Sequence, residues 1–299
     1  MKRLTIFTPT YNRAYILPEL YRSLKAQTNN DFIWLIVDDG STDGTGELVK
    51  SWIAENVIDI KYYYQENGGK MKAHNFGVQM TETEMFVCVD SDDWIACDSV
   101  EKIVAEFDKS DVGKKNELCG IVAYRGKKLN EVIGTEFPAN ISYDTLSGLY
   151  KKGFKGDTVL IFKTDIIRQY PFPIIENEKF ITEAYVYDQI DRKYKWHLFP
   201  SIITICQYNT DGLTLNLLKY NFKNPCGYVS YFIQKGNFST SIIETAKAYI
   251  RANAFRHMTR GVVLPVMVKY SVIYKITRPF GWILYLRKKF LYRKTRIKV

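Results

Sequence analysis

The chain has 299 residues, 46% of them hydrophobic and 15% aromatic, and a formal net charge of +10. This composition supports a sizeable core in one large domain, or in one domain with an appendage. The five cysteines are scattered, and no CxxC pair or His/Cys metal spacing occurs. We therefore expect reduced thiols in a cytoplasmic protein, rather than a disulfide framework or a zinc site. No uninterrupted apolar stretch reaches the roughly 18 residues needed to cross a bilayer.

The positive charge is concentrated near the C-terminus. Residues 241–299 contain 14 Lys/Arg and one acidic residue, Glu244, which gives this region a net charge of +13. Residues 1–240 carry the remaining charge of −3. The asymmetry indicates that the C-terminal region has an anionic partner.

Strands and helices are predicted to alternate in the N-terminal third of the chain. Apolar runs predict strands over 4–8, 32–37, 58–64 and 85–89, and helical spacing predicts helices over 16–27, 45–53 and 73–78. Further along, we predict a helix over 99–107, an irregular segment over 125–150, and strands over 119–124, 158–162 and 202–208. The alternating first part indicates a parallel sheet in an α/β domain. In such sheets, ligands bind beyond the carboxyl ends of the strands.

Three carboxylates follow the fourth predicted strand within four positions: Asp90, Asp92 and Asp93. They would repel one another in a dry site unless solvent or a cation neutralised them. Because Mg²⁺ or Mn²⁺ commonly bridges carboxylates to phosphates, the cluster indicates a metal site for a diphosphate. An exposed acidic turn or a helix N-cap is the alternative interpretation, since Asp suits both.

Polar residues also follow the other predicted strands, so we expect them to meet at one edge of the sheet. Asp38 or Asp39 can accept hydrogen bonds from a base or ribose, and the glycines of Asn67-Gly68-Gly69 let the backbone approach a ligand closely. Cationic donors for a diphosphate come next, at Lys70, Lys72 and His74. Each group alone also suits a turn, a cap or a structural histidine, but together they favour a nucleotide site. The glycine patterns of Rossmann cofactor sites and P-loops are missing.

These successive motifs resemble those of family 2 glycosyltransferases with the GT-A fold, over residues 3–215. The matching segments are Thr8-Pro9-Thr10-Tyr11-Asn12-Arg13, Asp38-Asp39-Gly40-Ser41, Asn67-Gly68-Gly69 through Ala73-x-Asn75-x-Gly77, and Asp90-Ser91-Asp92. The resemblance implies a mostly parallel, Rossmann-like sheet flanked by helices, a nucleotide-sugar donor (usually a UDP-sugar), a divalent cation (Mn²⁺ or Mg²⁺), and inversion at the anomeric carbon.

The resemblance also assigns individual roles. Asp38 and Asp39 are expected to contact the nucleobase, Asp90 the ribose, and Asp92 the metal. The remaining residues expected at the nucleotide-sugar site are Thr8, Pro9, Thr10, Tyr11, Arg13, Asn67, Gly68, Gly69, Lys70, Lys72, His74, Ser91 and Asp157. The family often has Arg at the position of His74, so Lys70 or Lys72 is expected to act as the cationic donor instead.

An inverting displacement needs a carboxylate that deprotonates the acceptor hydroxyl. Glu183 is the candidate, because it precedes an apolar, helix-like run and matches the position of the family's catalytic acid. The alternative is a first-turn acid that the helix dipole favours. Asp188 and Glu178 are weaker candidates for the base.

We expect a GT-A domain over residues 1–215, with a nucleotide-binding half over 1–95 and an acceptor half over 96–215. Segment 208–214 resembles a loop that closes over the donor. Residues 216–299 are expected to form a helical, basic extension that mixes its charge with four aromatic residues, Trp282, Tyr285, Phe290 and Tyr292. Such a mixture is typical of an interfacial helix on anionic lipid. Packing on the body or on a second subunit, and a nucleic-acid patch, are the alternatives.

The sequence therefore predicts a cytoplasmic glycosyltransferase, peripherally associated with the inner face of the cell membrane. Its acceptor is expected to be a glycan or a lipid-linked molecule used in cell-surface glycan synthesis. We expect no nucleic-acid partner and leave homo-oligomerisation open. Two other functions remain as alternatives: an inactive nucleotide-sugar-binding scaffold, and a metal-dependent nucleotidyltransferase.

Overall fold

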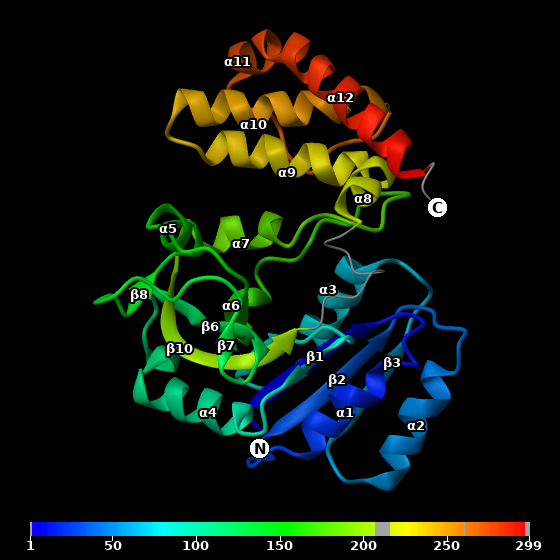
Figure 1. Ribbon diagram of the computed structural model, residues 1–299, viewed down its shortest axis with the longest axis vertical. Coiled ribbons are helices and arrows are strands. Elements are labelled where there is room, and N and C mark those ends of the chain that lie inside the picture. Colours follow the sequence, from blue (N-terminus) through cyan, green and yellow to red (C-terminus); the bar gives the residue numbers. More distant parts are fainter. Residues whose placement is uncertain (1, 207–215, 260, 297–299) are drawn as a thin grey trace. The chain divides into compact units, whose positions relative to one another are not determined.

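The structure is a computed structural model that describes residues 2–206, 216–259 and 261–296. The described chain forms two compact units (Figure 1). The first takes its residues from Met1–Pro171 and Tyr187–Asn209, and the second from Phe172–Val186 and Thr210–Val299. The expected boundary at residue 215 and the expected closing loop over 208–214 lie outside the described residues.

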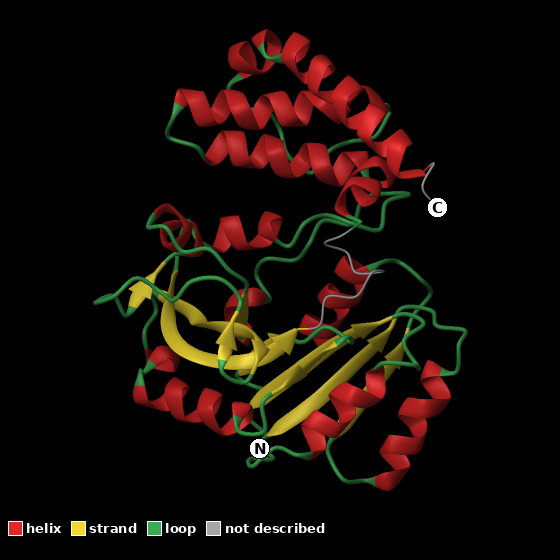
Figure 2. Ribbon diagram, viewed as in Figure 1, coloured by secondary structure: helices red, strands yellow, loops and turns green. Residues whose placement is uncertain are grey.

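The first unit is built on one mixed sheet (Figure 2). Its described strands are β1 (Leu4–Thr10), β2 (Phe32–Asp38), β3 (Ile60–Tyr64), β4 (Met85–Cys88), β5 (Asp93–Ile95), β6 (Leu118–Lys128), β7 (Glu131–Val132), β8 (Tyr143–Asp144), β9 (Thr158–Lys163) and β10 (Lys195–Cys206). Their order is β3-β2-β1-β4-β9-β6-β10-β5, with β7 beside β6 and β8 beside β10.

Strand direction separates the two ends of this sheet. The neighbours β3, β2, β1 and β4 are all parallel, as the sequence predicts. Strand β9 is antiparallel to both β4 and β6, and β5 is antiparallel to β10. Because β9 runs backwards, it begins at the edge of the sheet where β4 and β6 end. The expected α/β domain with a parallel sheet in the N-terminal third of the chain is thus confirmed, and the rest of the sheet is mixed.

Helices cover both faces of the sheet. The described helices of this region are α1 (Leu17–Lys25), α2 (Thr45–Glu55), α3 (Lys70–Met80), α4 (Ser99–Lys109), the 3₁₀ turn η1 (Val112–Lys114), α5 (Leu146–Lys151), α6 (Thr164–Ile167) and α7 (Ala184–Ile190). Helices α1, α2 and α4 bury apolar residues on the face that carries Leu4 and Ile6. Helix α3 packs on the other face, where Gly77 leaves room for the ring of Phe7. The apolar alternation of β1 thus serves two cores.

Strand β10 differs most from its prediction, because it begins at Lys195 rather than at residue 202. Its pairing with β6 shifts register between Phe199 and Ile202. Pro200 lies within that shift and has no N–H for a ladder hydrogen bond. The proline therefore interrupts the strand pattern, so the sequence predicts only the second half of the strand.

The second unit is mostly helical. Its described helices are α8 (Leu217–Lys223), α9 (Pro225–Phe238), α10 (Ile242–Phe255), the 3₁₀ turn η2 (Arg256–Met258), α11 (Ser271–Ile276) and α12 (Arg278–Arg296). Their core contains Val229, Ile233, Tyr249, Phe255 and Tyr274. Within the described ranges, no helix is both long and apolar enough to span a bilayer.

Candidate active site

The loops after β1 and β2 are joined by side-chain hydrogen bonds. The backbone N–H of Asn12 donates to Ser41 Oγ at 2.8 Å, and Asn12 Oδ1 accepts from the N–H of Thr42 at 2.8 Å. Asp38 accepts from the N–H of Ser41 and from the hydroxyl of Tyr62, both at 2.8 Å. Each loop therefore supplies the partners that the other loop's polar groups need, which fixes this part of the edge.

Asp39 connects the same loop to the start of α3. Its carboxylate accepts from the N–H of Gly68 at 2.8 Å, from the N–H of Gly69 at 2.7 Å and from the side-chain amide of Gln65 at 2.6 Å. The side-chain amide of Asn67 donates to the carbonyl of Asp39 at 2.7 Å. One carboxylate thus orders the whole glycine turn that the sequence places near the ligand.

Several of the residues expected at the ligand are buried. Asp38 is 0% and Asp39 5% exposed, and their carboxylates accept the hydrogen bonds described above. The fully buried hydroxyl of Thr8 accepts a hydrogen bond from the indole N–H of Trp34 at 3.0 Å. These three side chains hold the edge in shape, whereas the exposed ring of Tyr11 is open to a ligand.

Arg13 also takes part in the edge through the loop itself. Its backbone N–H donates to Thr45 Oγ1 at 3.2 Å, which ties the loop after β1 to the first residue of α2. Its guanidinium donates to the hydroxyl of Tyr15 at 2.5 Å on the exposed side of the loop. Thr10, which directly precedes Tyr11 at the end of β1, is buried, and Pro9 in the same strand is half-buried.

The acidic motif after β4 is neutralised by two cations. Lys70 Nζ lies 2.7 Å from Asp90 Oδ1, and Arg125 Nη1 lies 3.4 Å from Asp93 Oδ2. Burial favours the neutral form of Asp90, but the charges of Lys70 and Arg125 outweigh it and lower its pKa. Burial raises the pKa of Asp93 to about 7, although Arg125 opposes that shift. The motif is therefore a charged network and not an exposed acidic turn.

Cys206 completes this network from the end of β10. Its Sγ donates to Asp93 at 3.4 Å and lies 3.6 Å from Arg125 Nη1. Burial raises the pKa of the Cys206 thiol well above its usual value, so it stays protonated. The sequence analysis identified neither Arg125 nor Cys206. Neither residue belongs to a recognisable motif, and only the long-range pairing of β6, β10 and β5 brings them to the acids.

His74 does not supply the positive charge that the sequence predicts. Its imidazole is buried, with edge-to-face contacts to Phe7 and Phe86 at centroid distances of 5.7 and 5.4 Å. Burial, with a further contribution from the charge of Lys70, lowers the pKa of His74 to about 3. The ring is therefore neutral near pH 7. The two other predicted cationic donors are Lys70 and the exposed Lys72, whose side chain runs over Gly68.

The remaining acid of the motif, Asp92, differs from Asp90 and Asp93. Asp92 is half-buried and makes no hydrogen bond or ion pair with the part of the chain that the structure describes. Over the same described residues, no cluster of three or more His, Cys, Asp or Glu side chains has metal-binding geometry. A Mg²⁺- or Mn²⁺-type ion at Asp92 would therefore need phosphates and water as its other ligands. Ser91, between Asp90 and Asp92, is buried.

Asp157 directly precedes a strand and Glu183 directly precedes a helix, as the sequence predicts. Asp157 is exposed just before β9, and its carbonyl accepts from the N–H of Arg125 at 3.3 Å. Glu183 directly precedes α7 in the second unit, and its carbonyl accepts from the N–H of Val186 at 3.0 Å. The weaker candidate Glu178 has another role, because its carboxylate accepts from the N–H groups of Cys226 and Gly227 at the start of α9.

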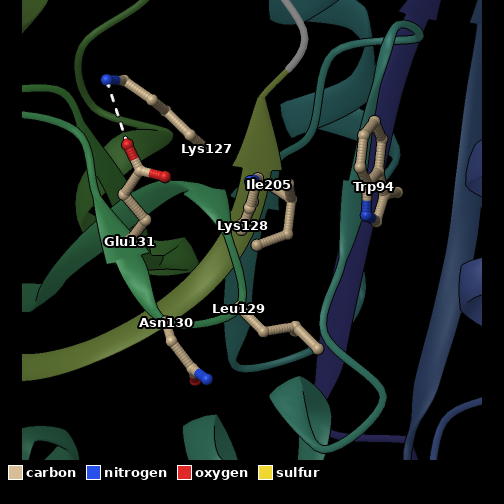
Figure 3. Close-up of a pocket in the computed structure, with 7 residues that line it drawn as sticks. All are labelled: Trp94, Lys127, Lys128, Leu129, Asn130, Glu131 and Ile205. Atoms are coloured by element: carbon tan, nitrogen blue, oxygen red, sulfur yellow. Dashed lines mark ion pairs between the residues drawn. The ribbon is translucent and has the colours of Figure 1, made fainter.

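A pocket of about 670 Å³ lies beside the acidic motif in the first unit (Figure 3). Its lining residues are Trp94, Lys127, Lys128, Leu129, Asn130, Glu131 and Ile205. Trp94 pairs with Ile205, and the next pair along, Asp93 with Cys206, contacts Arg125. Because successive side chains of a strand point to opposite faces, the pocket and the charged network use opposite faces of the same strands. Lys127 forms an ion pair with Glu131 at 3.2 Å across the hairpin.

The fold and the acids at its strand ends are those of a GT-A type transferase domain. The sequence model of Glycosyl transferase family 2 matches residues 5–171, which is more than half of the chain. The chain therefore belongs to glycosyltransferase family 2. This membership confirms the resemblance drawn from the motifs at Thr8, Asp38, Asn67 and Asp90.

Three of the similar curated proteins come from Streptococcus and Staphylococcus species. Glycosyltransferase GlyA of Streptococcus pneumoniae is 37% identical over 101 residues, which are 34% of this chain and 14% of that protein. The teichoic acid poly(glycerol phosphate) polymerase of Staphylococcus epidermidis is 31% identical over 112 residues, 37% of this chain and 16% of that protein. The poly(ribitol-phosphate) beta-N-acetylglucosaminyltransferase TarS of Staphylococcus aureus is 31% identical over 111 residues, 36% of this chain and 19% of that protein. The chain thus spans less than a fifth of each of these relatives.

Solved structures agree on the fold. S. aureus TarS 1–349 in complex with UDP-GlcNAc has a TM-score of 0.59 at 16% identity, and the match covers 98% of this chain and 92% of that one. The mannosyltransferase PcManGT of Pyrobaculum calidifontis, in complex with GDP-Man and Mn²⁺, has a TM-score of 0.56 at 16% identity, with 96% and 85% covered.

Proposed function

We propose that this chain transfers a sugar from a nucleotide-sugar to a hydroxyl of a cell-surface glycan or lipid-linked acceptor, with inversion. The sugar is a hexosyl or N-acetylhexosaminyl group, and a UDP-sugar is the first candidate for the donor. The observation that carries this proposal is the edge of the first unit, where the loops after β1, β2 and β3 are fixed together by Asp38 and Asp39. Relatives named as teichoic acid enzymes, and a similar structure named as a UDP-GlcNAc complex, support the choice of donor and pathway class.

The donor's diphosphate would meet positive charge at the start of α3. Lys70 is the first residue of that helix and Lys72 lies two positions further on. A helix N-terminus and two ammonium groups favour the departing nucleoside diphosphate as its negative charge grows. Asp92 would hold Mn²⁺ or Mg²⁺, which neutralises phosphate charge when bound, and Asp90 would contact the ribose. Asp90 also positions Lys70 through their 2.7 Å ion pair.

The acceptor hydroxyl would lose its proton to Glu183. Its place at the start of α7 and the family resemblance support this role. Asp157 and Asp188 are the next candidates. The lysines of the β6–β7 hairpin suit an acceptor that carries phosphate groups.

We place the enzyme on the inner face of the cell membrane as a peripheral protein, because residues 241–299 carry a net charge of +13. Anionic lipid attracts such a region, and each basic residue near the surface contributes about 1 kcal/mol. A lipid-linked acceptor would then be reached in two dimensions.

A ligand screen tests the donor proposal. The full chain is heated with a panel of UDP-, GDP- and dTDP-sugars, each with Mn²⁺, with Mg²⁺ or with EDTA. One nucleotide-sugar should raise the melting temperature only with metal, because a ligand that binds the native state stabilises it. The same donor should be hydrolysed slowly to the free nucleotide. Stabilisation without hydrolysis would favour the inactive scaffold, and no stabilisation by any donor would contradict the proposal.

A further inference from the structure

Helix α12 has a packed face and an outward face. Gly281, Tyr285, Lys288 and Tyr292 follow helical spacing, and they face the other helices of the second unit. A Cβ on Gly281 would lie 2.5 Å from Asn253 Cβ. The ring of Tyr285 lies 4.2 Å from that of His257, and the ring of Tyr292 stacks on Phe222 at 4.5 Å. The sequence analysis counted both tyrosines as lipid-facing, and the structure corrects this, because they are used in packing.

The opposite side of α12 is apolar and exposed. Ile283, Leu286 and Phe290 are spaced i, i+3 and i+7, so they form one stripe along the helix. They are 64%, 50% and 58% exposed. An aliphatic or aromatic side chain normally gains free energy by leaving water, so three aligned ones mark a surface with a partner.

Basic side chains border the stripe on both sides. At 100° per residue, Arg287 and Lys294 lie along one side of it, and Lys289 and Arg293 lie along the other. The whole helix contains seven Lys/Arg and no acidic residue. An apolar stripe with cationic borders is complementary to a lipid surface, whose acyl chains lie beneath negatively charged headgroups.

We propose that the stripe of Ile283, Leu286 and Phe290 inserts into the headgroup region of an anionic bilayer, with Arg287, Lys289, Arg293 and Lys294 on lipid phosphates. This inference deepens the peripheral membrane placement in the proposed function by naming the surface and its orientation. Helix α12 then lies parallel to the membrane, because its stripe runs along its length. Tyr285 and Tyr292 remain in the protein core and hold the helix in this orientation.

Vesicle sedimentation of the full chain tests the assignment. Wild type should sediment with phosphatidylglycerol/phosphatidylethanolamine vesicles and be released by high salt. The I283E/F290E variant should partition about tenfold less or lower, because charged side chains replace two inserted apolar ones. The R287Q/K294Q variant should lose about tenfold on these vesicles at low salt and bind phosphatidylcholine vesicles as wild type does.

A matched control separates insertion from general surface change. Ile242 is 75% exposed at the first turn of α10, where an acidic residue also suits the helix dipole. The I242E variant should bind anionic vesicles within about twofold of wild type, since one exposed residue off the stripe adds little. Circular dichroism and melting should show that I283E/F290E folds, because both side chains are exposed.

Two outcomes would overturn the inference. Wild-type binding by I283E/F290E would remove the stripe from the membrane contact. A wild-type dimer that ignores vesicles and that I283E/F290E dissociates, as measured by light scattering, would make the stripe an interface between copies. Hydrolysis of a soluble nucleotide-sugar without vesicles is measured in parallel. It can fail while vesicle binding succeeds, so failure of the proposed function is distinguishable.

Discussion

The two units of this protein differ in how their charged side chains are placed. In the first unit, two acids after β4 pair with cations: the half-buried Asp90 with Lys70, and the buried Asp93 with Arg125. In the second unit, α10 to α12 carry many basic side chains for a single acid, Glu244, which pairs with Lys247. Buried charges must find partners inside the molecule, whereas exposed charges can remain solvated or bind an external partner. The charged side chains therefore form a site in the first unit and a basic surface in the second.

The largest expected effect concerns the proposed base. Glu183→Gln keeps the shape of the side chain and removes the proton acceptor, so transfer should slow by about 10²–10⁴-fold. Donor binding, measured by the metal-dependent thermal shift, should stay near wild type, because the carboxylate acts on the acceptor. Full-rate transfer by this variant would make Glu183 a helix-opening acid only and would move the role to Asp157 or Asp188.

The next prediction tests the paired charges of the first unit. Arg125→Met leaves Asp93 without its cation, which should reduce the free energy of unfolding by about 2–4 kcal/mol for this largely buried pair. Urea denaturation measures the change. Arg125→Lys keeps the positive charge with fewer hydrogen-bond donors. It should recover at least half of the lost free energy of unfolding. If both variants unfold like wild type, the network is not a stabilising element.

Asp92 should matter for chemistry more than for stability. Asp92→Asn should lower donor hydrolysis by about 10²–10³-fold, since a lost ligand weakens the cation that neutralises the leaving group. The thermal shift produced by donor plus Mn²⁺ should shrink, while the melting temperature of the ligand-free protein stays within a few degrees of wild type. Equal hydrolysis by wild type with and without EDTA would remove the metal from the proposal.

His74 predicts a pH dependence whose sign follows from its pKa. The folded-state pKa of about 3 lies below the ordinary value of 6.5, so only the unfolded chain gains this proton as the pH falls. His74 therefore does not lower the free energy of unfolding above pH 6.5. Below pH 6.5 this free energy falls by up to about 1.4 kcal/mol per pH unit. His74→Gln should flatten the decline in unfolding free energy between pH 6.5 and 4. An unchanged slope would show that the imidazole is protonated in the folded protein.

The smallest effect is expected in the second unit and completes the comparison. Arg287 is exposed on α12, so Arg287→Gln should change the free energy of unfolding by no more than about 0.5 kcal/mol. The same urea experiment as for Arg125 provides the measurement. A loss comparable with that of Arg125→Met would show that the charge of the second unit is used internally, and it would weaken the distinction between the two units.

Local pattern predicted the first unit better than the second. The runs that became β1, β2 and β4 are short and apolar, and each ends in polar residues, so their ends could be aligned from sequence alone. The role of Arg125 could not be predicted, because it depends on β6 lying beside β10 and β10 beside β5, which are pairings between distant segments. The burial of His74 could not be predicted for a related reason, because the rings that it contacts, Phe7 and Phe86, come from two other elements.

The orientation of α12 shows a different limit. Composition identified a basic and aromatic helix, but the aromatic residues divide between its two faces. Tyr285 and Phe290 are five positions apart, which is about 140° around the helix. One therefore packs against Phe255 while the other is exposed. Counting aromatic residues does not reveal this division, whereas helical spacing combined with a known packed face does.

The contact between Glu178 and the start of α9 has a consequence for synthesis of the chain. The carboxylate and the N–H of Cys226 are separated by 48 residues in sequence. At roughly 5–20 residues per second, the ribosome needs about 2–10 s to add those residues. During that interval Phe180, whose ring contacts Tyr220 of α8, and Ile181, which lies against Gly227 of α9, lack these partners. Two side chains that are buried in the folded protein are therefore exposed to aggregation and to chaperones until the start of α9 has been made.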